Sequence, residues 1–157
     1  MVPSARSRST ARAVLLGPVE DRFGRRLDAL LAAAVGVLTF VAYVAGAFAV
    51  SGGVVFLPWH ATLVGFVTAG LVGYRGGGLT FGWLAVLAPL YGFHADWALF
   101  GLSSRSLAGQ VEYLFQPTAF VVFSLAALVV GTVGFAAGVA LWRGLGAVRG
   151  RFGAQSS

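Results

Sequence analysis

The feature that most constrains the fold is a set of long apolar runs. Each run carries at most one acidic or basic residue, and the four runs cover residues 27–50, 54–74, 79–100 and 118–142. A helix needs about 20 mostly apolar residues to cross the ~30 Å hydrocarbon core of a membrane. Soluble domains carry about 25% charged residues, whereas only 10% of this chain is charged. The sequence therefore predicts an all-α bundle of four transmembrane helices.

The basic residues mark the ends of these runs. The chain has eleven of them, all arginine, and ten lie before the first run, between the second and third runs, or after the fourth. Only Arg105 lies in the other connections. Because basic residues accumulate in cytoplasmic loops, we predict an up-down-up-down chain in the plasma membrane with both termini in the cytoplasm. This topology explains the net charge of +6, so nucleic-acid binding is not predicted.

Polar segments divide the chain into three regions. Residues 1–26 form a basic cytoplasmic tail with a short amphipathic lead-in helix, residues 27–142 form the four-span domain, and residues 143–157 form a second cytoplasmic tail. The glycine-rich RGGG at 75–78 follows a predicted span rather than a strand. It is therefore interpreted as a tight turn and not as a phosphate-binding loop. The absence of cysteine excludes thiolate chemistry and disulfides.

The longest external connection, residues 101–117, has the pattern of an interfacial helix. Its apolar residues fall on one helical face, namely Leu107, Val111, Leu114 and Phe115. Its polar or small residues fall elsewhere, namely Arg105, Gly109, Gln110 and Glu112. Ser103 or Ser104 is a candidate N-cap, and Pro117 ends the segment. We predict an amphipathic helix on the outer surface of the membrane, between spans three and four.

Small residues recur every four positions in two of the predicted spans. The second span carries Ala61, Gly65, Ala69 and Gly73, and the fourth carries Gly134 and Gly138. Lipid tails are as apolar as leucine, so membrane helices associate where small side chains let their backbones approach each other. We interpret these residues as helix packing inside one bundle. A face for homo-oligomers is the alternative.

The stretch FHADW, residues 93–97, ends an apolar run with polar groups. On a helix, His94 and Asp96 differ by about 200° around the axis, so they do not bind one metal ion together. Asp96 shares its face with small residues and is expected inward, whereas His94 shares its face with bulky residues and is expected toward lipid. A carboxylate near the bilayer needs a partner or headgroup water. We expect Asp96 to pair with Arg105, in an outer polar cluster that includes Glu112.

Two histidines lie at one predicted depth on neighbouring spans. His60 is 14 residues from Tyr74 and His94 is 15 residues from Leu79, which puts both about 21–22 Å above the inner boundary. Such a pair is able to ligate a b-type haem or a metal ion. Both histidines also lie close to tryptophans, a combination typical of the membrane interface, where no ligand is needed.

Three stretches together carry a resemblance to a known group: FGRRLDALLAAAVGVLTF, YRGGGLTFGWLAVLAPLYGFHADWALFGL and VVGTVGFAAGVALWRG. With its arginine-only basic set and its richness in alanine, valine and glycine, the chain resembles the small four-span membrane proteins of haloarchaea over residues 20–145. The resemblance implies a four-span membrane fold. It implies no activity, so no functional residue is carried over.

The sequence contains no recognisable catalytic set, since it lacks a carboxylate pair, a Ser/His/Asp arrangement or a phosphate loop at a useful position. We expect a non-enzymatic subunit or scaffold, without a cofactor, that binds other membrane proteins or itself through its small-residue faces. The first alternative is a haem- or metal-binding redox protein that uses His60 and His94. The second is a minor permease or channel component, with Asp96, Arg105 and Glu112 at its outer mouth.

Overall fold

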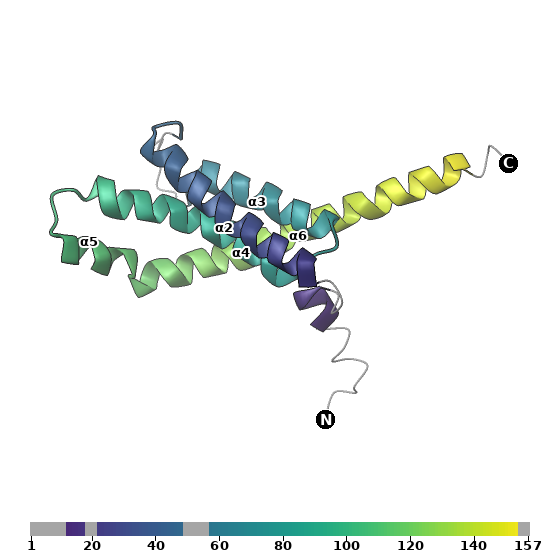
Figure 1. The fold of residues 1–157 in the computed structure, drawn as a ribbon, viewed down its shortest axis with the longest axis horizontal. Coiled ribbons are helices and arrows are strands. Elements are labelled where there is room, and N and C mark those ends of the chain that lie inside the picture. Colours follow the sequence, from purple (N-terminus) through teal and green to yellow (C-terminus); the bar gives the residue numbers. More distant parts are fainter. Residues whose placement is uncertain (1–11, 18–21, 49–56, 154–157) are drawn as a thin grey trace, which may run out of the picture.

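The computed structural model describes residues 12–17, 22–48 and 57–153. The remaining parts of the predicted basic tail and lead-in helix, residues 1–11 and 18–21, lie outside the described residues. Every regular element in the described ranges is a helix (Figure 1). The predicted all-α class is therefore confirmed for this part of the chain.

Within the described residues from 22 to 153, five α-helices and one π-helical turn follow one another. They are α2 (Arg22–Val44), α3 (Trp59–Tyr74), α4 (Leu79–Asp96), the π-helical turn η1 (Trp97–Gly101), α5 (Leu107–Leu114) and α6 (Pro117–Gly153). A further helical turn covers residues 12–16. α4 lies at the centre, where it packs against α2, α3 and α6, while α3 and α6 also pack against each other (Figure 1). α5 contacts η1, which continues α4.

Small residues build the interior between these helices. Among the described residues, six alanines are buried, namely Ala32, Ala61, Ala69, Ala85, Ala98 and Ala127. Glycines bring the backbones of neighbouring helices together. A Cβ atom at Gly65 would lie 2.8 Å from the Cα atom of Val86, and one at Gly92 would lie 2.6 Å from the carbonyl oxygen of Gly36. The contacts of α4 with α3 and with α2 therefore depend on residues without a Cβ atom.

In the part of the chain that the structure describes, two helical segments are long and apolar enough to cross a membrane, Phe23–Val44 and Leu107–Ala147. α3 has 16 residues and α4 has 18, which corresponds to about 24 and 27 Å at 1.5 Å per residue. Both are shorter than the ~30 Å hydrocarbon core of a typical bilayer. By length and composition alone, only the segments Phe23–Val44 and Leu107–Ala147 of the described chain therefore qualify as membrane spans.

The predicted runs and the observed helices differ at their ends. α2 ends at Val44, because Gly46 adopts a left-handed conformation with φ 71° and its N–H donates to the Tyr43 carbonyl oxygen. A glycine of this kind is a common helix terminator. The predicted limits at residues 50 and 54 lie outside the described residues. α6 continues to Gly153, well past the limit that the sequence predicts for the fourth span.

The external connection contains the short helix α5. Its N-cap is Ser106, whose Oγ atom accepts a hydrogen bond from the Gly109 N–H at 3.3 Å. The expectation that Ser103 or Ser104 caps this helix is therefore wrong. The reason is that Leu102 ends the preceding π-helical turn and the Arg105 N–H donates back to the Leu102 carbonyl oxygen. The helix cannot begin until the chain has left this turn.

Candidate functional site

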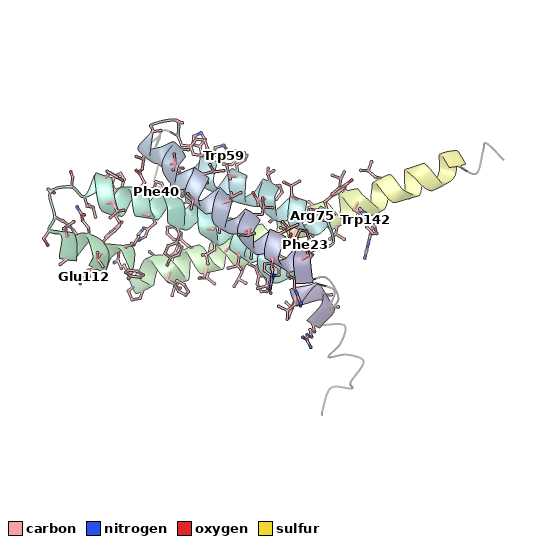
Figure 2. The ribbon with its side chains drawn as sticks, in the orientation of Figure 1. Phe23, Phe40, Trp59, Arg75, Glu112 and Trp142 are labelled. Atoms are coloured by element: carbon pink, nitrogen blue, oxygen red, sulfur yellow. The ribbon has the colours of Figure 1, made fainter. Side chains whose placement is uncertain are left out.

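At one end of the molecule, the carboxylate of Asp28 is buried against the turn between α3 and α4. Only 5% of this side chain is exposed, and its Oδ1 atom lies 3.8 Å from Nη1 of Arg75, which is 45% exposed. A buried carboxylate stays charged only when a counter-charge or hydrogen bonds compensate for its lost hydration. Arg75, the C-cap residue of α3, supplies this counter-charge. Figure 2 shows Arg75 at the end of the molecule opposite to Glu112.

Each glycine of the RGGG turn has a separate structural role. Gly76 adopts φ 76°, a left-handed conformation that L side chains rarely adopt. A Cβ atom at Gly77 would lie 2.5 Å from Oδ2 of Asp28, and one at Gly78 would lie 2.6 Å from the carbonyl oxygen of Leu15. The turn therefore admits the carboxylate on one side and the backbone of the N-terminal segment on the other.

Sequence reasoning misses Asp28 and Arg75 as members of one site. The available signal is that Asp28 is the one charged residue of the run at 27–50, and Arg75 is the one basic residue of the connection at 75–78. Their separation along the chain does not reveal that this connection folds against α2. The contact is visible only once α2 and α4 are packed together.

At the other end of the molecule, His94 is buried by α5 and α6. Only 4% of the residue is exposed, and its Nε2 atom lies 3.1 Å from the Tyr113 carbonyl oxygen. Because a carbonyl only accepts, Nε2 carries the proton and donates this bond. The imidazole ring stacks on the ring of Tyr113 with centroids 4.9 Å apart, and the ring of Phe123 meets it edge-on at 5.5 Å.

The expected orientation of His94 toward lipid is therefore wrong. His94 is the buried residue of the two, whereas Asp96 is only partly buried. The error arises because the prediction considered the faces of α4 alone, and α5 folds back to cover the face with the bulky residues. Within the described residues, no ion pair joins Asp96 to Arg105. Arg105 and Glu112 are both exposed, so the structure does not assemble the predicted outer polar cluster.

The two histidines contact different neighbours. The ring of His60 stacks on Phe48, with centroids 4.9 Å apart and an interplanar angle of 11°. Phe48 follows the end of α2, whereas His94 faces α5 and α6. The Nε2 atom of His94 already donates to a backbone carbonyl group. The described residues contain no group of three or more metal-ligating side chains, and none of the contacts brings the two imidazole rings to one shared point.

The predicted small-residue positions lie at contacts within the chain. Ala61, Gly65, Ala69 and Gly73 are all buried on α3. On α6, a Cβ atom at Gly134 would lie 2.7 Å from the Phe66 carbonyl oxygen, and one at Gly138 would overlap the Gly70 carbonyl oxygen. These glycines bring α3 and α6 together.

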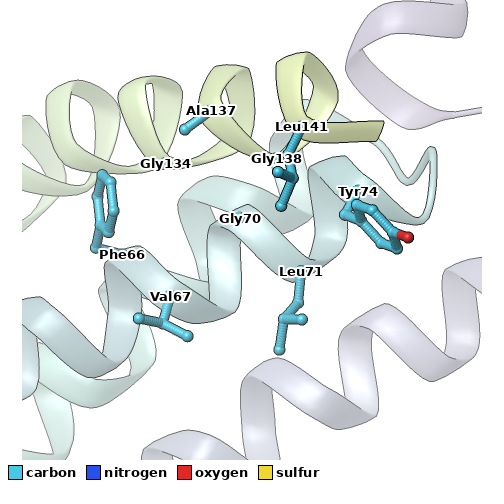
Figure 3. Close-up of a pocket in the computed structure, with 9 residues that line it drawn as sticks. All are labelled: Phe66, Val67, Gly70, Leu71, Tyr74, Gly134, Ala137, Gly138 and Leu141. Atoms are coloured by element: carbon cyan, nitrogen blue, oxygen red, sulfur yellow. The ribbon is translucent and has the colours of Figure 1, made fainter. Parts of the chain in front are cut away.

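An apolar groove of about 360 Å³ runs beside this contact (Figure 3). From α3 it is lined by Phe66, Val67 and Tyr74, and from α6 by Ala137 and Leu141, among others. It opens to the outside of the molecule and holds no charged side chain among its lining residues. Its lining is therefore mainly apolar, with Tyr74 carrying a hydroxyl group.

Comparisons with protein families, curated proteins and solved structures find no match to this chain. The resemblance to small four-span membrane proteins of haloarchaea therefore stays a prediction. No relative supplies a substrate, a partner or a catalytic residue, so the function has to be argued from the chain's own geometry.

Proposed function

We propose that this chain is an integral membrane protein in which α2, α3, α4 and α6 each cross the bilayer. Both ends of the chain lie on the cytoplasmic side of the plasma membrane. The protein acts as a non-enzymatic subunit or scaffold that binds other membrane proteins or a second copy of itself. The observation that carries this proposal is the distribution of large and small side chains.

This distribution is the inverse of that in a water-soluble protein. Alanine and glycine make up much of the interior, while Phe23 and Trp59 are 72% and 71% exposed, and Figure 2 shows both on the outside of the helices. Leaving a large apolar side chain in water forgoes about 1.5–3 kcal/mol of transfer free energy. In lipid, the same side chain has an apolar environment, and the helices associate through small residues instead.

The short helix α5 shows the same inversion. Its polar residue Gln110 is buried and donates from Nε2 to the Leu102 carbonyl oxygen at 3.3 Å. Its apolar residues Leu107 and Phe115, the latter at the C-cap, are 79% and 75% exposed. An interfacial helix has this arrangement when its apolar face enters the bilayer. α5 therefore supports the predicted position on the outer surface of the membrane.

Residues typical of membrane interfaces lie at the two ends of the helices. Trp59 and Trp97 are exposed at the end that carries α5. Trp142 is exposed toward the other end, which also carries Arg75 and Arg143. Tryptophan belts mark the two interfaces of a bilayer, and arginine marks the cytoplasmic side. This arrangement supports four crossings, although α3 and α4 are shorter than a typical span.

The alternatives receive less support from the geometry. The predicted outer cluster is not assembled, and the hydroxyl group of Thr68 donates to the Val64 carbonyl oxygen of its own helix at 2.8 Å. A conducting pathway needs polar groups that follow one another through the core. His60 and His94, which define the redox alternative, contact different neighbours. A role through protein contacts therefore explains the chain better than transport or redox chemistry does.

The membrane topology can be tested with single cysteines, because the natural chain has none. We expect Glu112→Cys to react with a membrane-impermeant maleimide in intact cells, and Ala147→Cys to react only after permeabilisation. The cysteine-free chain is the control and should stay unlabelled. Labelling of both positions from the same side, or release of the protein from membranes by alkaline carbonate, would contradict the proposal.

The role as a subunit can be tested by purification from native membranes in mild detergent, followed by native mass spectrometry. We expect a complex of fixed stoichiometry that contains this chain and at least one further chain or copy. A protein that remains a single chain under these conditions, at native expression levels, would contradict the role as a subunit or scaffold. The topology measurement would be unaffected by that result.

A further inference from the structure

The N-terminal segment, residues 12–17, is held on the molecule by its backbone. A Cβ atom at Gly78 would lie 2.6 Å from the carbonyl oxygen of Leu15 and 2.8 Å from the backbone nitrogen of Gly17. Gly17 itself is buried and left-handed, with φ 75°. Figure 1 shows this segment at the end of the molecule where α2 begins. It therefore rests on the turn between α3 and α4 through main-chain contacts, which leave its side chains available for other contacts.

The side chains of this segment are exposed although they are apolar. Val14, Leu15 and Leu16 are 52%, 38% and 38% exposed. Phe23, near the start of α2, is 72% exposed, and Figure 2 shows it at the same end of the molecule as Arg75. In water, such side chains would forgo their transfer free energy. This end of the molecule therefore displays apolar side chains that suit an apolar environment.

The charge at this end is positive. Arg12 and Arg26 are exposed, and the Arg75 side chain is 45% exposed beside the buried Asp28. The first 28 residues of the sequence carry six arginines and three acidic residues. A guanidinium group forms paired hydrogen bonds with the oxygens of a phosphate group. The chemistry that complements this surface is therefore an anionic phosphate next to an apolar layer.

The breadth of the apolar surface favours a lipid over a protein helix or a nucleic acid. Val14, Leu15 and Leu16 are consecutive on a helical turn, so their side chains spread over about 200° around its axis. A helix that docks in a protein groove uses a narrower stripe, with anchors three and four residues apart. A nucleic acid is bound mainly through its phosphates, which leaves the apolar side chains in water. A segment in a membrane interface combines a broad apolar face with basic residues.

We propose that the N-terminal segment is a binding site for anionic phospholipids of the inner leaflet. Val14, Leu15 and Leu16 enter the acyl layer next to the headgroups, while Arg12 and Arg26 contact the lipid phosphates. This inference rests on the proposed function, because the turn between α3 and α4 lies at the level of the headgroups only if both helices cross the bilayer. Each basic residue near an anionic surface should strengthen this binding about fivefold.

The test uses single cysteines, because the natural chain has none. The full chain is reconstituted as Val14→Cys in nanodiscs of phosphatidylcholine alone, or of equal parts of phosphatidylcholine and phosphatidylglycerol. A neutral polyethylene-glycol maleimide, which does not enter the bilayer, measures how accessible the cysteine is from water. The matched control is Ala147→Cys, an exposed position of α6 outside the N-terminal segment.

We expect Val14→Cys to react at least about fivefold more slowly in the anionic nanodiscs than in phosphatidylcholine, and the rates of Ala147→Cys to differ by less than about twofold. Adding Arg12→Gln and Arg26→Gln to Val14→Cys should remove most of this protection. Adding Arg105→Gln instead, at the opposite end of the molecule, should leave it unchanged. Raising the salt from about 0.1 to about 1 M should also weaken the protection, because the Debye length falls from ~10 to ~3 Å.

Equal rates of Val14→Cys in the two kinds of nanodisc, or protection that the two arginine substitutions do not reduce, would overturn the inference. Protection by inorganic phosphate in phosphatidylcholine nanodiscs would identify a phosphate site that needs no lipid. Protection by an added oligonucleotide in the same nanodiscs would identify a nucleic acid as the partner, and both results overturn the proposal. Extraction of the chain by alkaline carbonate would instead refute the proposed function itself.

Discussion

Asp28 and His94 are buried polar residues at opposite ends of the molecule, and they are enclosed in different ways. At one end, Asp28 is enclosed by backbone, namely the RGGG turn and, beyond it, residues 12–17, with Arg75 as its counter-charge. At the other end, His94 is enclosed by aromatic side chains and donates a hydrogen bond to the Tyr113 carbonyl oxygen. Substitutions should therefore be tolerated much less at the first end than at the second.

The physical reason is that backbone cannot move aside as a side chain can. A Cβ atom added at Gly77 or Gly78 meets the Asp28 carboxylate or the backbone of the N-terminal segment. When an aromatic ring near His94 is replaced, the neighbouring side chains can rotate to accommodate the change. Burial also costs the Asp28 carboxylate hydration free energy, which its counter-charge has to offset. The stability of variants at the two ends, measured in the same way, separates these contributions.

The largest effect is expected from Gly77→Val in the turn. A Cβ atom there would lie 2.5 Å from Oδ2 of Asp28, so the substitution forces the carboxylate and the turn apart and should cost about 3 kcal/mol of unfolding free energy. The measurement is tryptophan fluorescence during unfolding by SDS in mixed micelles. The matched control is Gly144→Val in α6, where a Cβ atom meets nothing within 4 Å. A similar loss in both variants would refute the argument from close approach.

A smaller effect is expected from Arg75→Gln. It removes a counter-charge from Asp28, but Arg75 is 45% exposed and the atoms are 3.8 Å apart, so water already screens part of the attraction. We expect a loss of about 1–2 kcal/mol, between the values for exposed and fully buried pairs. A double-mutant cycle with Asp28→Asn should give a coupling of about 1 kcal/mol. Additive losses would show that the two charges do not interact.

At the opposite end, His94→Phe is expected to cost about 1 kcal/mol. The phenyl ring keeps the stacking on Tyr113, but the hydrogen bond to its carbonyl oxygen is lost, and this oxygen keeps the bond from the Gln116 N–H. Amide hydrogen exchange should accelerate in α5 and not in α2. Tyr113→Phe is the matched control, since it keeps the ring and the carbonyl group and should leave the exchange of α5 unchanged. Unaltered exchange in the His94 variant would show that the bond does not hold α5 in place.

The contrast between the ends also explains what the sequence could predict. The apolar runs indicate helices because each run is much longer than a strand, and the spacing of Gly134 and Gly138 marks a face suited to close packing. The sequence does not indicate where α2 ends, because Gly46 terminates the helix inside an apolar run. Such a terminator depends on one backbone conformation and leaves the hydropathy of the run unchanged.

The buried polar groups could not be predicted because their environment comes from other elements. The faces of α4 indicate which side chains are bulky, but the burial of His94 depends on α5, which lies more than ten residues later in the chain. In the same way, Asp28 is buried by a turn that follows α3. Periodicity within one helix carries no information on which loop folds over its end.

The smallest effect is expected where the sequence suggested an ion pair and the structure has none. Asp96 is partly buried and Arg105 is exposed, and no ion pair joins them within the described residues. Arg105→Gln should therefore change the unfolding free energy by no more than about 0.5 kcal/mol, as for other exposed positions. A double-mutant cycle with Asp96→Asn should give a coupling below about 0.3 kcal/mol. A coupling as large as that expected for Asp28 and Arg75 would mean that both ends use a charge pair, and the contrast between them would then be one of enclosure alone.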